Sequence, residues 1–137
     1  MSEVRDWNVL GRGSLPALVG VEVLEVGAGR VRSRLAVRPD LLAPNGYLPA
    51  ASAVALADTS CGYGTVASAL AEGRGFTMIE LKGNVLGTLT EGVLGCEAAL
   101  VDGGRTTQMW DARVTAEASG KRLAFFRCTQ LPLSPAD

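Results

Sequence analysis

The sequence contains no histidine. This absence excludes a Ser-His-Asp triad, a Cys-His pair, a histidine-ligated metal and a histidine-dependent dehydratase site. An excess of charge is also lacking, because 13 Lys and Arg residues face 14 Asp and Glu residues and the formal net charge is −1. Neither sign gathers in runs, so no nucleic-acid partner is expected.

Long apolar runs are lacking as well. No segment reaches the roughly eighteen uninterrupted apolar residues of a membrane-spanning helix, and the N-terminus has no apolar signal core. The three cysteines, Cys61, Cys96 and Cys128, form an odd set without CxxC spacing and lie in apolar or small-residue segments. This pattern indicates reduced, buried thiols. We therefore expect a cytoplasmic protein without a membrane partner.

What is present fits one domain over residues 1–137, since 47% of the 137 residues are hydrophobic. Residues 1–18 are expected to form a short lead-in on the surface. Alternating patterns predict strands over 21–26 and 30–38, joined by a Gly-Ala-Gly turn with positive-φ residues. The alternation of the first strand slips after Val23, which indicates a bulge.

A different kind of segment follows. Residues 49–71 are rich in alanine and apolar nearly all round, which predicts a helix surrounded by protein on nearly all sides. Four further strands are predicted, and their short connections favour antiparallel neighbours: 76–86, 93–101, 105–115 and 121–131. The predicted fold class is α+β, with one strongly curved antiparallel sheet around one long central helix.

Asp58 is the only charged residue between positions 41 and 71. Burial of a carboxylate without a partner costs several kcal/mol or raises its pKa. One interpretation is that Asp58 accepts hydrogen bonds from backbone amides or pairs with a lysine or arginine. The other makes it a nucleophile or general base in an interface cleft. On the same helix, Gly62 and Gly64 favour a close approach of a partner's backbone, whereas Trp110 is assigned to the core.

Several motifs occur in an order that resembles a known family. Asn45-Gly46, then Pro49-Ala50-Ala51 and Leu56-Ala57-Asp58-Thr59, are similar to the start of the central helix in hot-dog-fold acyl-CoA thioesterases. The nearest branch holds the phenylacetate-degradation (PaaI-type) and 4-hydroxybenzoyl-CoA thioesterases. Gly104-Arg105-Thr106 resembles the Gly-Arg-Thr strand of that family, and Ser119-Gly120-Lys121 resembles its late hairpin. The resemblance covers residues 15–131.

The resemblance implies hydrolysis of an acyl-CoA to free acid and coenzyme A, without a metal or redox cofactor. It makes Asp58 the general base or nucleophile. Where the family has His-Gly-Gly, this chain has Pro49-Ala50-Ala51, and Ala50 matches the first glycine, whose N–H binds the thioester oxygen. The residues implied to contact substrate or coenzyme A are Ala51, Thr59, Arg105 and Thr106. The altered motif leaves a second hypothesis open, a hot-dog protein that binds acyl-CoA without turnover.

Arg105 and Thr106 either contact coenzyme A, as the resemblance implies, or form a solvated strand edge. Two further site candidates also carry a structural alternative. Asn45 either positions a water or the thioester, or serves only the Asn-Gly turn. Thr65 either orients the water or donates a hydrogen bond to the carbonyl four residues back.

Helix geometry bears on the assembly. Ala50 and Asp58 are eight residues apart, about 12 Å along a helix, so they cannot touch one carbonyl from the same chain. The expected assembly is therefore a homodimer with antiparallel helices. The resemblance implies the same arrangement, often with two such dimers paired into a tetramer.

Overall fold

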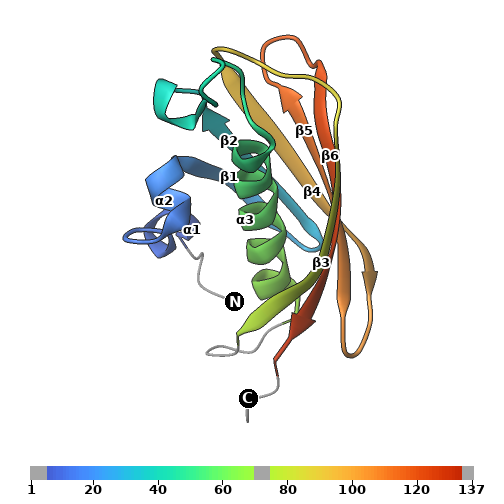
Figure 1. The fold of residues 1–137 in the computed structure, drawn as a ribbon. Coiled ribbons are helices and arrows are strands. Elements are labelled where there is room, and N and C mark those ends of the chain that lie inside the picture. The colour runs from blue at the N-terminus through green and yellow to red at the C-terminus, as the bar shows by residue number, and fades with distance from the viewer. Residues whose placement is uncertain (1–5, 70–74, 134–137) are drawn as a thin grey trace.

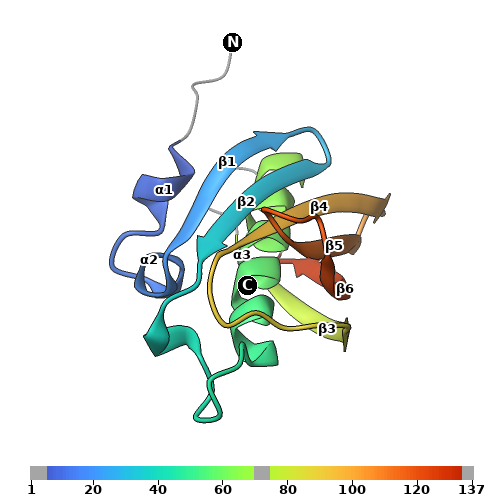
Figure 2. The same cartoon turned by 90° about the horizontal axis from the view of Figure 1, so that it is seen from above.

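A six-stranded antiparallel sheet and one long helix dominate the computed structural model, which describes residues 6–69 and 75–133. The strand order is β1-β2-β4-β5-β6-β3, and helix α3 lies across one face of the curved sheet (Figures 1 and 2). The helical elements are α1 (Trp7–Leu10), α2 (Leu15–Val19), the 3-10 helix η1 (Pro39–Leu41) and α3 (Ala50–Ala69). The strands are β1 (Val21–Gly27), β2 (Arg30–Ala36), β3 (Phe76–Val85), β4 (Val93–Gly103), β5 (Gln108–Ala116) and β6 (Arg122–Pro132).

The β1–β2 hairpin follows the sequence pattern. Val31, Ser33 and Leu35 of β2 are buried beneath α3, and alternate residues point to the other face. Gly29 in the turn has a φ of 70°, and the register shifts between Val23 and Glu25. The predicted positive-φ turn and the predicted bulge are both confirmed.

Helix α3 packs so closely on the sheet that two of its positions require glycine. A Cβ atom at Gly64 would lie 2.3 Å from the Trp110 ring, and one at Gly62 would lie 2.9 Å from the ring of Phe76. The close approach at both glycines is therefore made by aromatic side chains of the same chain. The expectation that a partner's backbone approaches there is wrong.

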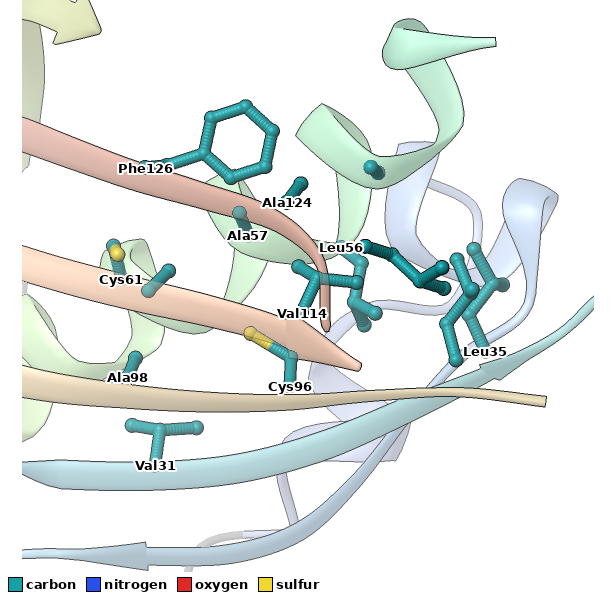
Figure 3. Packing of buried hydrophobic residues seen from close by; sticks show 14 of the residues in the cluster. Val31, Leu35, Leu56, Ala57, Cys61, Cys96, Ala98, Val114, Ala124 and Phe126 are labelled. Atoms are coloured by element: carbon teal, nitrogen blue, oxygen red, sulfur yellow. The ribbon is translucent and has the colours of Figure 1, made fainter. Parts of the chain in front are cut away.

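The core lies between α3 and the sheet, where Leu35, Leu56 and Val114 are fully buried (Figure 3). Trp110 belongs to this core, as predicted, and its indole Nε1–H donates a hydrogen bond of 2.9 Å to the Gln108 Oε1. The three cysteines are free and buried, which confirms their interpretation as structural thiols. Desolvation raises the pKa of Cys96 to about 11, so this thiol stays protonated at neutral pH.

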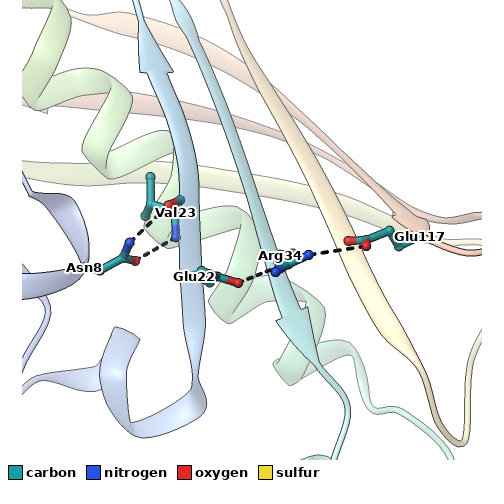
Figure 4. Close-up of polar contacts among 5 residues, drawn as sticks. All are labelled: Asn8, Glu22, Val23, Arg34 and Glu117. Carbon is teal, nitrogen blue, oxygen red and sulfur yellow. Dashed lines mark hydrogen bonds and ion pairs between the residues drawn. The ribbon is translucent and has the colours of Figure 1, made fainter.

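The side chain of Asn8 in α1 forms hydrogen bonds with the outer edge of the sheet at β1 (Figure 4). The amide of Asn8 accepts a hydrogen bond from the Val23 N–H and donates one to the Val23 carbonyl, at 2.8 and 3.1 Å.

On the face opposite α3, Arg34 bridges Glu22 and Glu117, with N–O distances of 2.6 and 3.6 Å. Exposed ion pairs of this kind contribute at most about 1 kcal/mol each.

Two differences from the sequence prediction go beyond a shift of one or two residues at an element's end. The lead-in contains the short helices α1 and α2 on the surface, where no element was predicted. Strand β5 begins at Gln108 rather than at Arg105, because the Gly104 N–H donates to the Thr107 carbonyl and closes a turn. The predicted end of the long helix, residues 70–71, lies outside the described residues. No helix in the described part of the chain is long and apolar enough to cross a bilayer.

Candidate active site

One side of α3 remains open in the single chain, because the sheet covers only the opposite side. We call the exposed or half-buried side chains of this side around Asp58 the open stripe: Ala51, Val54, Ala55, Asp58 and Thr59. The helix is therefore not wrapped on nearly all sides, and Asp58 is exposed rather than buried. This corrects the sequence prediction for the isolated chain. The apolar composition of the stripe is typical of a helix face that another surface covers.

The Asp58 carboxylate has no hydrogen bond or ion pair with any residue of 6–69 or 75–133. Neighbouring atoms nevertheless desolvate it enough to raise its pKa above the ordinary value of 3.8. The interpretation of Asp58 as a carboxylate fixed by backbone amides, lysine or arginine therefore finds no support. A carboxylate without a partner and with a raised pKa is suited to accept a proton.

The start of α3 offers backbone donors. Ser52 N–H donates to the Pro49 carbonyl at 3.2 Å, whereas the N–H groups of Ala50 and Ala51 have no hydrogen-bond acceptor among the described residues. Both alanines are exposed, and the helix dipole places partial positive charge at this end. An anionic oxygen could therefore bind at this helix end.

Residues outside the predicted site hold this helix end in place. Thr88 Oγ1 and the Leu89 carbonyl both accept a hydrogen bond from the Leu48 N–H, at 3.0 and 3.1 Å. The Ser52 hydroxyl donates to the Leu41 carbonyl at 2.7 Å. The sequence analysis placed Thr88 only in the connection between the predicted strands 76–86 and 93–101, and no local signal showed that this connection contacts the segment before α3.

The other predicted site residues do not gather around Asp58. Asn45 Oδ1 accepts a hydrogen bond from the Tyr47 N–H at 3.1 Å, beside Gly46 with its φ of 87°, so its side chain stabilises the turn. Thr65 is fully buried, and its hydroxyl donates to the Cys61 carbonyl at 2.8 Å. Thr59, by contrast, is half-buried next to Asp58 on the open stripe.

Arg105 and Thr106 are exposed in the turn between β4 and β5. Figure 1 shows this turn at the lower end of the sheet, whereas α3 begins near the upper end. A single chain therefore does not bring Arg105 and Ala50 together. Ala50 and Asp58 are also separated, by about 12 Å along α3. Over residues 6–69 and 75–133, no cluster of three or more carboxylate or thiol groups could hold a metal ion.

Comparison with known proteins places this geometry in context. No protein-family model matches the sequence. A thioesterase from Pseudomonas aeruginosa superposes with a TM-score of 0.87 at 24% identity, over 96% of this chain and 97% of that chain. A thioesterase from Haemophilus influenzae gives a TM-score of 0.86 at 23% identity, over 95% and 90% of the two chains. The chain has the hot-dog fold.

Two further similarities agree with the hot-dog assignment. The PaaI protein of the phenylacetic acid degradation operon of E. coli has a TM-score of 0.78 at 18% identity, over 87% of this chain and 83% of that chain. A 1,4-dihydroxy-2-naphthoyl-CoA hydrolase from Listeria monocytogenes is 29% identical over 115 residues, which are 84% of this chain and 92% of that protein. The predicted fold class and the resemblance to hot-dog thioesterases of the PaaI branch are confirmed.

Proposed function

We propose that this hot-dog protein hydrolyses the thioester bond of an acyl-coenzyme A. One observation carries the proposal: the same helix presents a carboxylate without a partner, Asp58, and unoccupied N–H donors at its start, Ala50 and Ala51. General bases and oxyanion donors are the two groups that acyl transfer requires. The similarity to a CoA hydrolase and to thioesterases supports the same reaction class.

The reaction would use groups from two chains. Asp58 of one subunit takes a proton from water, whose oxygen attacks the thioester carbon, or its carboxylate attacks that carbon itself. The Ala50 N–H of the partner helix stabilises the negative charge that develops on the carbonyl oxygen. In the general-base route the carbon–sulfur bond then breaks, and the thiolate of coenzyme A takes up the proton that Asp58 removed from water. In the nucleophilic route the carbon–sulfur bond breaks to leave a mixed anhydride on Asp58, the thiolate takes up a proton from solvent, and water then hydrolyses the anhydride to the free acid and the Asp58 carboxylate. In this reaction Ala51 and Thr59 line the substrate path, while Arg105 and Thr106 bind the coenzyme.

The proposed assembly is a homodimer, alone or paired into a tetramer. Strand β3 ends the sheet and presents Ile79 and Val85, with 57% and 52% of their surface exposed. Pairing of two β3 edges across a two-fold axis would set the open stripes of the two α3 helices against each other. Each helix start would then face the partner's Asp58. The three free cysteines fit a cytoplasmic location.

A thiol-release screen over aromatic, medium-chain and branched acyl-CoAs tests the proposal, with 1,4-dihydroxy-2-naphthoyl-CoA included. We expect wild type to release thiol from at least one ester, and Asp58→Asn to lower kcat at least about a hundredfold, since asparagine takes up no proton. The matched control is Asp40→Asn in η1, which is exposed and outside the stripe and should retain full activity.

The opposite outcomes are equally clear. Near-wild-type turnover by Asp58→Asn would remove Asp58 from the mechanism. Binding of coenzyme A esters without thiol release from any member of the panel would replace hydrolysis with the second hypothesis, a non-catalytic acyl-CoA-binding protein. The experiment includes this second function because the chain has Pro49-Ala50-Ala51 where the family has His-Gly-Gly.

A further inference from the structure

Two neighbouring pockets lie on either side of Phe125 and are lined almost entirely by strands β3, β5 and β6. One has a volume of about 370 Å³ and is lined by Leu86, Arg113, Arg122, Ala124 and Phe125. The other has a volume of about 260 Å³ and is lined by Lys82, Gly83, Asn84, Phe125 and Arg127. We call the two pockets together the Phe125 hollow. Small-molecule sites have volumes of about 300 to 1,000 Å³, so the hollow has room for a small ligand.

The register places the hollow on the sheet face opposite α3. Arg113 pairs with Phe125, which pairs in turn with Asn84. Ala112, Val114 and Phe126 next to them are buried in the core under α3. Because neighbouring side chains of a strand point to opposite faces, Arg113 and Phe125 point away from the helix. The Phe125 hollow is therefore separate from the stripe that carries Asp58.

Positive charge accumulates around the hollow without compensation. Of its four cationic side chains only Arg127 is neutralised, through two hydrogen bonds to Asp111 at 2.6 and 2.9 Å. Lys82, Arg113 and Arg122 form no ion pair with any residue in the described ranges. Like charges that share a small area repel one another, so an anion would stabilise the cluster.

The remaining arginines of this face show the contrast. On β2, Arg30, Arg32 and Arg34 each pair with a glutamate. Glu97 lies opposite Arg113 in the register but forms its ion pair with Arg30 at 3.2 Å. Glu80, two residues before Lys82, lines neither pocket. Among the cationic side chains of the strands on this face, the unpaired ones therefore lie at the end of the sheet that carries the pockets.

The chemistry of the hollow combines a flat apolar ring with donors for phosphate. Phe125 is half-buried between the pockets, so a planar base could stack on its ring. Arg113 and Arg122 can each bind phosphate oxygens with two N–H groups, and Lys82 adds a point charge. We propose that the Phe125 hollow binds a phosphorylated nucleotide, with the base on Phe125 and the phosphates among Arg113, Arg122 and Lys82.

Isothermal titration with four probes tests this proposal: adenosine diphosphate, adenosine, pyrophosphate and coenzyme A. We expect adenosine diphosphate to bind at least about ten times more tightly than adenosine or pyrophosphate, and to weaken as salt rises. The double variant Arg113→Gln, Arg122→Gln should lose at least about tenfold in affinity, since both phosphate-binding forks are removed. Phe125→Leu should weaken binding of the nucleotide but not of pyrophosphate.

The matched control is Arg32→Gln, an exposed arginine of the same sheet face that pairs with Glu25 at 3.8 Å. It should bind adenosine diphosphate like wild type. Circular dichroism and the melting temperature verify that each variant is folded. Asp58→Asn should also bind the nucleotide normally, so the result does not depend on whether the protein is a hydrolase.

The coenzyme A titration identifies the source of the nucleotide. Loss of coenzyme A affinity in the double variant would assign the hollow to the nucleotide part of coenzyme A, whereas unchanged affinity would assign it to a free nucleotide. Two results would overturn the proposal. One is no binding of adenosine diphosphate or of coenzyme A, whatever the oligomeric state. The other is nucleotide binding that the double variant leaves unchanged.

Discussion

At the scale of single residues, one methyl group separates Ala50 from the glycine that the resembling family has at this position. The backbone N–H is the same in both residues, and in this structure it has no acceptor among the described residues. The side chain of Ala50 is exposed, so its methyl group narrows the space through which an oxygen atom approaches the N–H but does not block it. The chemistry at this position therefore depends on the main chain.

Substitutions at Ala50 separate the main chain from the side chain. Ala50→Gly keeps the N–H and should preserve or modestly raise kcat. Ala50→Pro deletes the N–H and should lower kcat by about a hundredfold or more, the usual effect of losing one oxyanion donor. Proline is acceptable in the first turn of a helix, so circular dichroism should show a folded protein. Equal activity of all three proteins would disprove the role of the Ala50 N–H.

The raised pKa of Asp58 predicts the pH dependence of hydrolysis. A general base acts in its ionised form, so kcat/KM should fall as pH drops through a pKa above the ordinary 3.8. The chain contains no histidine whose titration could obscure this fall in kcat/KM. Because the folded-state pKa is raised, Asp58 favours folding below its unfolded pKa and loses this contribution as pH rises.

Asp58→Asn gives the control for that pH profile. The residual kcat/KM of the variant should not fall as pH drops through this range. Its melting temperature at neutral pH should equal or exceed that of wild type. If kcat/KM of Asp58→Asn fell at the same pH as in wild type, another group would cause the fall.

Sequence reasoning found Asp58 because a single charge in an apolar helix is a local signal. It did not predict that Asp58 is exposed in one chain, since exposure depends on what covers the other side of the helix. Asn45 and Thr65 show a similar limit. Their residue types allow either catalysis or a local hydrogen bond, and only the structure shows that both make the local bond.

At the scale of elements, the packing of α3 on the sheet is controlled by small residues. Gly64 lies against Trp110, which is fully buried and held by its hydrogen bond to Gln108. The sequence predicted a special role for this glycine, because glycine weakens a helix interior. It could not identify the contact, since Trp110 is 46 positions away and reaches Gly64 only through the fold.

Gly64→Ala should lower the free energy of unfolding by about 1 to 3 kcal/mol through overpacking, although alanine favours a helix by about 1 kcal/mol. The added Cβ atom would lie 2.3 Å from a ring that has no room to move. Gly27→Ala at the end of β1 is the control, because its Cβ would meet nothing within 4 Å. Chemical denaturation measures both, and a Gly64→Ala protein as stable as wild type would contradict the packing argument.

The short helices α1 and α2 show why some elements escaped prediction. Four or five residues are too few for a stable isolated helix. Helix α1 is stabilised instead by Asp6, whose Oδ1 accepts hydrogen bonds from the Asn8 and Val9 N–H groups, and by the bonds of Asn8 to β1. The Asn8–Val23 bonds link positions 15 residues apart, and neither these bonds nor the Asp6 cap leave a periodic pattern in the sequence.

At the scale of the whole molecule, the roles proposed for Ala50 and Asp58 require two chains, because eight residues separate these positions on α3. This requirement follows from the sequence and the geometry of a helix, because the offset is about 12 Å in any straight α-helix. The surface through which we propose that the two chains pair was not evident from the sequence. The strand order shows that β3, and not one of its neighbours in sequence, ends the sheet.

Light scattering should therefore show a dimer or a tetramer. Ile79→Lys places a charge on the exposed edge strand and should yield a monomer with no measurable thiol release. Leu18→Lys on α2, a side chain with 71% of its surface exposed, is the control and should keep the wild-type mass and activity. A stable, fully active monomer would contradict both the shared site and the role of the β3 edge.

The two hydrogen bonds between Asn8 and Val23 affect how many copies of the chain can join by strand pairing. Growth by strand addition needs two open edges on every copy, one to receive a strand and one to offer the next. In this protein the Asn8 amide already occupies the N–H and the carbonyl of Val23 on β1. A pair joined through β3, as proposed above, would present on both sides a β1 edge whose Val23 is already bonded, and this bonding would oppose growth of the pair into a filament by strand addition.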